Sequence, residues 1–423
     1  MHKFCFLLTS WEVDFILHIK PTETLFSKIL LEGTGMKKKG FVVLTAALAL
    51  TAGMVFSAGA AELDTENPIK IGYVGALSGD TALWGQAGLN GMELTAEMIN
   101  EEGGILGREV QIIGLDGKGV SDDSVAAYKK LVEENGVCAV VGTNFSSCNI
   151  PIAAVADELK VPVIATAASN ELVTVAEDGT LHPYSFRLCF IDSYMGYLAG
   201  SYAYTELGLK TCAVIEDITD SYSTSVGDYM VETFTGLGGE LVASEEAQNG
   251  DNDFRAQLTK IAAKQPDVLF VPWNYENVAL IGQQARELGI TAVLFGADGW
   301  DTTELIELSN GALEGCYYVS RPGFNLPEAA AYGEIYGAKV NIALETECLY
   351  GNDGLQWIKA AIEAAGSDDP TAIRDQLEAT ESFDGLLGHM SIDPATHNPS
   401  RDAAIFRVDA EEVTYVGIYD PEA

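Results

Sequence analysis

Short apolar runs alternate with longer amphipathic stretches from residue 69 onward, a pattern typical of the strands and helices of a parallel sheet. A first series predicts strands at 69–77, 110–115, 137–141 and 161–165 and helices at 85–101, 122–134 and 147–159. A second series, after an apolar segment at 185–188, predicts helices at 193–207, 223–235, 254–264 and 277–288 and strands at 212–215, 240–243, 268–271 and 292–295. Two such series predict an α/β protein with two doubly wound, Rossmann-like sheets.

The remaining residues extend this pattern without a Pro- or Ser-rich linker. They predict a strand at 315–320, helices at 328–343, 352–364 and 370–380, and a strand-rich tail with apolar pieces at 386–387, 403–408 and 413–419. The absence of a linker favours two lobes joined by short crossovers. Open parallel sheets receive ligands beyond the carboxyl ends of their strands, so we expect a ligand between the lobes.

The composition changes this picture little, but the charge excludes one class of partner. The 423 residues are 48% hydrophobic and 20% charged, as in a globular protein long enough for two domains. There are 62 acidic and 24 basic residues, a net charge of −38 that would repel phosphate backbones and anionic membranes. We therefore predict no nucleic-acid partner.

One segment near the N-terminus has the three parts of a secretory signal peptide. Three lysines at 37–39 precede an uncharged stretch from 41 to 60 that ends in small residues. We predict a signal peptide at 36–61, a doubtful extension at 1–35, and export to the periplasm. A membrane anchor is the alternative, and the small residues at the distal end disfavour it. The chain from Glu62 has 18 basic and 58 acidic residues, a net charge of −40.

Cysteine and histidine give no catalytic or metal-binding pattern. The cysteines beyond the leader form no C-x-x-C pair and no ligand spacing with histidine, and their disulfide pairing is left open. His182, His389 and His397 fall in segments that resemble surface loops or a tail strand. No base is placed near Ser146 or Cys148 for a nucleophile. We predict no metal, no cofactor and no enzyme activity.

Four loops that follow predicted strands hold the candidate binding residues. The first, 77–85, contains Trp84 and lacks the glycine spacing of a dinucleotide or phosphate loop. The second, 142–148, leads into a helix, where hydroxyls and free N–H groups suit a carboxylate, although ordinary helix capping by Ser146 explains the loop equally well.

The other two loops suit the two ends of a zwitterion. The loop at 166–170 offers Ser169 and backbone groups. The loop at 296–300 offers Asp298, a carboxylate that would pair with an ammonium group; the alternative is a turn Asp before Gly.

Several segments in fixed order carry a family resemblance. They are 71–79 (IGYVGALSG), 100–108 (NEEGGILGR), 161–164 (VPVI), 186–187 (FR) and 284–289 (QARELG). With them the chain resembles the Leu/Ile/Val-binding protein family, the branched-chain amino-acid receptors of ABC transporters. The resemblance implies the type I periplasmic-binding fold with three crossovers. It also implies lobes at 62–188 plus 322–401 and at 189–321 plus 402–423, a monomer, and a permease partner.

The resemblance also implies roles for seven residues. In the family, the residues matching Ser146, Ala167 and Ser169 bind the ligand's α-carboxylate, and the latter two also contact its ammonium group. The acid matching Asp298 completes the ammonium site. The aromatic residues that match the side-chain pocket are Trp84, Tyr222 and Tyr275.

Two departures limit what the resemblance implies about the ligand. Phe145 replaces a cysteine of some relatives, and Asn274 replaces a second pocket tyrosine, which adds a polar group. The resemblance implies capture of an amino acid, branched-chain or otherwise hydrophobic or aromatic. The alternatives are a sensory module, or a ligand such as an amide, a urea or an aromatic acid.

Overall fold

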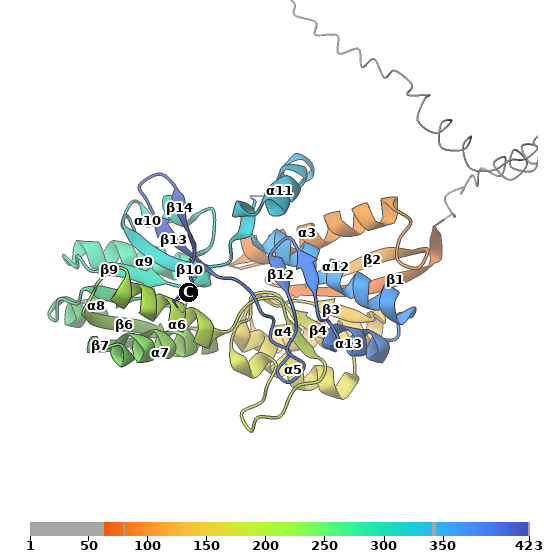
Figure 1. The fold of residues 1–423 in the computed structure, drawn as a ribbon, viewed down its shortest axis with the longest axis horizontal. Helices are drawn as coiled ribbons and strands as arrows, with labels where there is room; N and C mark the ends of the chain where they lie inside the picture. The colour runs from red at the N-terminus through yellow and green to blue at the C-terminus, as the bar shows by residue number, and fades with distance from the viewer. Residues whose placement is uncertain (1–62, 80, 341–343, 422–423) are drawn as a thin grey trace, which may run out of the picture. The chain divides into compact units, whose positions relative to one another are not determined.

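The computed structural model describes residues 63–79, 81–340 and 344–421, which are built around two sheets covered by helices (Figure 1). The first sheet has the strand order β2-β1-β3-β4-β5 and is parallel throughout. Its strands are β1 (Asp64–Gly75), β2 (Arg108–Asp116), β3 (Ala139–Val141), β4 (Val163–Ala165) and β5 (Ser185–Arg187). The direction of winding reverses at β1, which makes the sheet doubly wound.

Helices cover both faces of the first sheet because its central strands are apolar on both faces. Ile71 and Tyr73 pack into a core with α3 and α12, whereas Val74 packs on the opposite face with α4 and α5. The helices of this lobe are α3 (Ala82–Glu101), α4 (Ser121–Lys130), α5 (Ser146–Leu159), α11 (Pro327–Lys339), α12 (Glu347–Ala365) and α13 (Pro370–Glu378). Strands buried on both faces are typical of parallel sheets.

The second sheet repeats this topology and adds two antiparallel strands. Its order is β14-β13-β10-β9-β8-β6-β7, and the segment from β7 to β10 matches the order of the first sheet. Its strands are β6 (Thr211–Asp217), β7 (Glu240–Ala247), β8 (Val268–Phe270), β9 (Val293–Gly296), β10 (Cys316–Ser320), β13 (Ala404–Val408) and β14 (Val413–Ile418). The strands β13 and β14 run antiparallel at one edge.

The second sheet is also covered on both faces. Cys212 and Val214 contact the core under α6 and α7, and the alternate residues Ala213 and Ile215 contact the core under α8 and α9. The helices are α6 (Asp192–Thr205), α7 (Ser221–Gly236), α8 (Arg255–Ala262), α9 (Tyr275–Glu287) and α10 (Leu305–Ser309). The period-2 alternation of the strands thus divides the apolar residues between two cores.

The chain passes between the two sheets three times. It leaves the first sheet after β5, returns after β10 to the helices α11 and α12, and passes back before β13. The predicted α/β fold with two doubly wound lobes and three crossovers is therefore confirmed.

Two details of the sequence reading are wrong. Residues 386–387 form no strand; they are the turn between β11 (Phe383–Gly385) and β12 (Gly388–Met390). The N–H groups of Leu386 and Leu387 donate to the buried carboxylate of Asp353 at 2.7 and 2.9 Å, so an internal acid satisfies this apolar turn. His397 was predicted in a surface loop or a tail strand. It is instead fully buried, and its ring stacks on Phe186 with centroids 4.1 Å apart.

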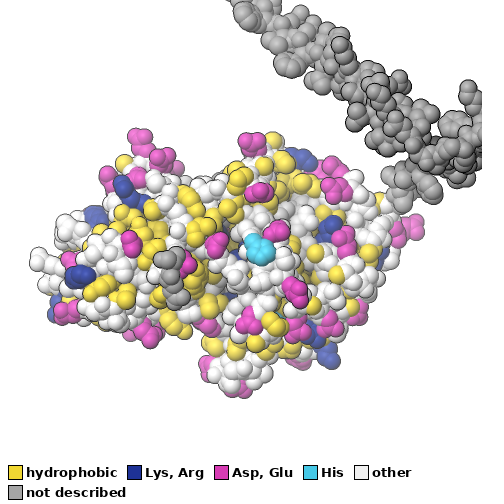
Figure 2. Space-filling view, in the orientation of Figure 1, with side chains coloured by type: hydrophobic (Ala, Val, Ile, Leu, Met, Phe, Trp, Pro, Cys, Tyr) yellow, Lys and Arg dark blue, Asp and Glu magenta, His cyan; other side chains and the backbone are white. Residues whose placement is uncertain are grey.

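Acidic side chains are scattered over the face shown in Figure 2, with fewer lysines and arginines among them. This distribution agrees with a solvated acidic surface rather than one acidic patch. In the part of the chain that the structure describes, no helix combines the length and apolarity needed to span a bilayer. The predicted signal peptide at 36–61, the extension at 1–35 and the end of the predicted helix at 341–343 lie outside the described residues.

Candidate ligand-binding site

A small cavity lies where the carboxyl ends of strands from both sheets meet. Nearly all of its residues stand in loops or helix starts that directly follow a strand, as expected for doubly wound sheets. They are Trp84, Asn144, Phe145, Ser146, Ala167, Asp220, Tyr222, Asn274, Asp298, Gly299, Arg321 and Glu347. Both lobes therefore contribute residues to one cavity.

The first lobe presents a helix N-terminus to the cavity. Ser146 is the first residue of α5, and its Oγ accepts a hydrogen bond from the backbone N–H of Asn170 at 3.1 Å. Ala167 follows β4 and lines the cavity beside it. The unpaired N–H groups of a first helical turn carry partial positive charge, so this wall suits an anionic group.

Trp84 closes the cavity from the first turn of α3. The helix approaches the preceding loop so closely that a Cβ at position 85 would collide with the carbonyl oxygen of Ala76, which explains Gly85. The indole ring is 4% exposed and packs edge-on against Tyr275 with centroids 4.7 Å apart. Because Tyr275 belongs to α9, this aromatic pair joins the two lobes.

The second lobe presents carboxyl groups to the cavity. Asp298 begins a short 3₁₀ turn after β9, and the next residue, Gly299, donates its N–H to the hydroxyl of Tyr222 at 3.0 Å. Asp220 caps α7, its carboxylate accepting from the N–H of Tyr222 at 3.2 Å. Burial raises the pKa of Asp298 to about 6, against the opposing effect of Arg321, and raises that of Asp220 to about 7.

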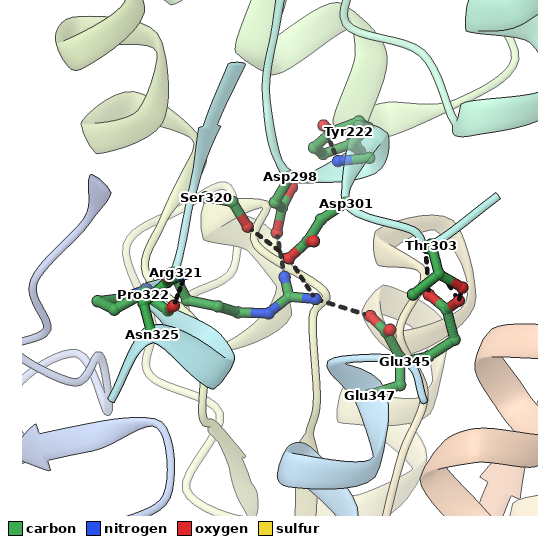
Figure 3. A network of polar contacts seen from close by, with 11 residues as sticks. Tyr222, Asp298, Asp301, Thr303, Ser320, Arg321, Pro322, Asn325, Glu345 and Glu347 are labelled. Carbon is green, nitrogen blue, oxygen red and sulfur yellow. Dashed lines mark hydrogen bonds and ion pairs between the residues drawn. The ribbon is translucent and has the colours of Figure 1, made fainter. Parts of the chain in front are cut away.

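A buried arginine, Arg321, connects Asp298 to the first lobe (Figure 3). Nη2 of Arg321 contacts Oε1 of Glu347 at 2.9 Å and Oδ2 of Asp301 at 3.4 Å, while Nη1 lies 3.5 Å from Oδ2 of Asp298. The guanidinium also lies over the ring of Tyr350, 4.7 Å from its centroid. Burial raises the pKa of Glu347 to about 8, despite the opposing effect of Arg321. One cation therefore faces three carboxyl groups.

Several hydrogen bonds join the lobes, and we call two of them, which lie close in sequence to the cavity residues Tyr222 and Glu347, the rim contacts. The side-chain amide of Asn170 donates to the carbonyl oxygen of Ser221 at 3.1 Å, and the N–H of Thr303 donates to Oε1 of Glu345 at 3.1 Å. Together with the pair of Trp84 and Tyr275, they hold the two walls of the site in contact.

The structure brings together five of the seven residues predicted from the sequence. Trp84, Ser146, Ala167, Tyr222 and Asp298 line the cavity. Ser169 and Tyr275 do not line it. Ser169 is fully buried and its carbonyl oxygen accepts from the N–H of Asp192, and Tyr275 lies behind Trp84.

Sequence reasoning missed the charged residues Asp220, Arg321 and Glu347. Asp220 and Arg321 follow strands directly, as Asp298 does, and this position was the signal that could have identified them. Glu347 stands at the start of a helix, where acids are common for reasons unrelated to a ligand.

The described residues contain no cluster of three or more His, Cys, Asp or Glu side chains arranged for a metal. Six cysteines lie in the same residues, and each is free and buried: Cys138, Cys148, Cys189, Cys212, Cys316 and Cys348. Burial raises the pKa of the Cys148 thiol, so the cysteine nearest the cavity loop is not activated as a thiolate.

Two doubly wound lobes that enclose a polar cavity at their strand ends define a two-lobed ligand-binding protein. The periplasmic binding protein family model matches residues 68–412, and the chain belongs to this family. It is 31% identical over 314 residues to an amino acid binding protein of Pseudomonas aeruginosa, covering 74% of this chain and 82% of that protein.

Solved structures of similar proteins support the assignment of the chain to this family. The leucine binding protein LivK of Thermotoga maritima has a TM-score of 0.77 and 29% identity, covering 84% of this chain and 99% of that one. The branched-chain amino acid transporter substrate binding protein LivJ of Streptococcus pneumoniae, solved in complex with isoleucine, has a TM-score of 0.77 and 28% identity, covering 84% and 100%.

Proposed function

We propose that this chain is the extracytoplasmic solute-binding protein of an ABC importer, which captures an amino acid between its lobes for a membrane permease. The observation that carries the proposal is the pairing of opposite walls around one cavity: Ser146 at the N-terminus of α5 faces it from the first lobe, and Asp298 faces it from the second. A zwitterion has a carboxylate for the first wall and an ammonium group for the second.

Each predicted residue has a role in this proposal. Ser146 and the backbone at Ala167 bind the α-carboxylate, and Ser169, which does not line the cavity, supports this wall by accepting from the N–H of Asp192. Asp298 accepts from the ammonium group, since its Oδ2 contacts Arg321 at 3.5 Å but has no hydrogen-bond partner among the described residues. Tyr222, Trp84 and Tyr275 enclose the side chain, Tyr275 by supporting Trp84.

The remaining parts of the proposal concern the context of binding. The lobes comprise 62–188 plus 322–401 and 189–321 plus 402–423, and they move apart to admit the ligand. A signal peptide at 36–61 directs the chain to the periplasm, where it acts as a monomer without a cofactor and without chemistry on its ligand. The names of its relatives, which are amino-acid and Leu/Ile/Val-binding proteins, support transport as the purpose.

A thermal-shift screen of the chain from residue 62 with the common amino acids tests the proposal. A ligand present at 100 times its Kd stabilises the folded state by about 2.7 kcal/mol, enough to shift the midpoint clearly. Asp298→Asn should abolish the shift. Asp301→Asn is the matched control, because Asp301 also contacts Arg321 but does not line the cavity. If no amino acid shifts the midpoint while an amide, a urea or an aromatic acid does, the proposal is overturned.

A further inference from the structure

The charged part of the cavity has a composition that the aromatic pocket residues do not explain. Among the cavity residues that the structure describes, Asp220, Asp298 and Glu347 carry carboxyl groups and Arg321 carries the one guanidinium. Asp298, Arg321 and Glu347 are buried, with Arg321 3% and Glu347 4% exposed, whereas Asp220 is half-buried. The cavity therefore holds a surplus of carboxyl groups over cationic groups, and a cationic ligand would favour their ionised form.

Several polar atoms of these residues also lack a hydrogen-bond partner. Nη1 and Nε of Arg321, Oε2 of Glu347 and Oδ2 of Asp298 are buried and make no hydrogen bond with other described residues. The same holds for Oδ1 of Asn144 and Nε1 of Trp84 on the first-lobe wall. Buried polar atoms are nearly always hydrogen-bonded in folded proteins, so unpaired atoms in one cavity point to a ligand that pairs with them.

An aliphatic side chain would be a poor occupant of this space. It would displace water from Glu347 and Arg321 and return no hydrogen bond to either. Sites built to hydrogen-bond a group on their substrate reject the analogue that lacks it by large factors. The surplus of acids in the cavity, in turn, disfavours a second carboxylate on the ligand.

We infer that the ligand is an amino acid with a basic, nitrogen-bearing side chain, and that Glu347 is the residue that selects it. The inference rests on the proposed function, with the α-ammonium group at Asp298. A side-chain ammonium or guanidinium donates to Oε2 of Glu347, the carboxylate oxygen that does not contact Arg321. The second positive charge then offsets the surplus that Arg321 alone leaves.

Matched ligands test the inference by isothermal titration calorimetry of the chain from residue 62. Lysine and norleucine share a straight side chain and differ in the terminal ammonium, and arginine and citrulline differ in the charge of the terminal group. We expect lysine to bind at least about tenfold more tightly than norleucine, because norleucine leaves Oε2 of Glu347 without a hydrogen bond. We expect arginine to bind more tightly than citrulline, because the neutral ureido group of citrulline offers Oε2 no charge-assisted bond. Leucine, isoleucine or norleucine binding as tightly as lysine overturns the inference, as does a preference for glutamine or glutamate.

Substitution of Glu347 tests whether this residue selects the basic side chain. Glu347→Gln should weaken lysine at least about tenfold and leave norleucine nearly unchanged, since only the charged ligand loses a partner. Glu334→Gln, at an exposed position on α11, removes the same charge from the surface and should change neither ligand. If Glu347→Gln weakens both ligands equally, Glu347 supports the fold and does not select the side chain.

The failure of this inference and of the proposed function are distinguishable. If only an aliphatic amino acid binds tightly, the proposed function stands and the inference of a basic side chain on the ligand is wrong. If no amino acid binds, both the proposed function and this inference are wrong.

Discussion

Nη2 of Arg321 lies 2.9 Å from Oε1 of Glu347, and this ion pair crosses from one lobe to the other inside the cavity. Arg321 directly follows β10 of the second sheet, and Glu347 begins α12, which packs in the core of the first. Since Asp298 and Asp301 also contact the guanidinium, the arginine balances acids of both lobes at once. The stability of this region therefore depends on one cation.

Replacing that cation should destabilise the protein strongly. Arg321→Met leaves Glu347, Asp298 and Asp301 without their counter-charge, and removing one partner of a buried charge pair typically costs about 3–5 kcal/mol. Urea unfolding measures the change. Arg255→Met is the control, because Arg255 contacts Asp253 and Glu287 at the surface, where the effect should be slight. Equal losses for the two variants would contradict a central role for Arg321.

The buried acids should make the ligand-free protein less stable as the pH rises. Burial raises the pKa of Asp298 to about 6, of Glu345 to about 7 and of Glu347 to about 8. In the unfolded state these carboxyl groups have their ordinary pKa values near 4. Between about pH 4 and 8 the folded state therefore holds protons that the unfolded state has lost, and the free energy of unfolding falls as the pH rises. Thermal midpoints measured from pH 5 to 8.5 should therefore decline.

The variant Glu347→Gln separates this effect from general charge repulsion. It removes one titrating group with its pKa of about 8, so its midpoint should decline less steeply between pH 6.5 and 8.5 than that of the wild type. Parallel profiles for the two proteins, or a wild-type midpoint that rises with pH, would contradict the assignment.

The fold was predictable because its pattern is local. Each strand of the two series is a short apolar run, and each helix is a longer amphipathic stretch, so the period of the pattern distinguishes them. The error at 386–387 shows where this fails. Leu387 is 4% exposed, but its segment is a turn whose N–H groups bind Asp353, a residue more than thirty positions earlier that no local pattern could indicate.

The site was predictable only in part, for a related reason. Loops after strands identify which residues face the cavity, and Ser146 and Asp298 were found in this way. The pairing of Arg321 with Glu347 depends on how the second crossover places α12, which the sequence does not state. Tyr275 was assigned to the cavity itself, but it begins α9 and packs behind Trp84, next to the lining residue Asn274.

The packing of Tyr275 on Trp84 should affect ligand binding indirectly. Tyr275→Leu removes an aromatic contact of a kind that contributes about 0.5–1.5 kcal/mol beyond its buried area, and the indole then loses its fixed position. We expect the affinity to fall about three- to tenfold, measured by titration calorimetry. Tryptophan fluorescence provides a second measurement, because the signal of Trp84 should respond to ligand in the wild type and less in the variant. An unchanged affinity would show that Trp84 holds its place without Tyr275.

The bond from Asn170 to Ser221 should contribute to holding the lobes together around the ligand. Asn170 uses its backbone N–H for Ser146 and its side-chain N–H for the carbonyl oxygen of Ser221. Asn170→Ala therefore keeps the first bond and removes the one between the lobes, together with the local bond that Oδ1 accepts from the N–H of Leu172. A hydrogen bond of this kind contributes about 0.5–1.5 kcal/mol, and affinity should fall by about two- to tenfold. The loss should appear mainly as faster ligand release in stopped-flow measurements, because the bond forms only when the walls meet.

Thr303→Val is the companion variant, since it removes the hydroxyl that contacts Glu345 in the other rim contact and leaves the backbone bond in place. If both variants release ligand at the wild-type rate, the rim contacts do not hold the ligand in, and the enclosed aromatic and charged groups account for its retention.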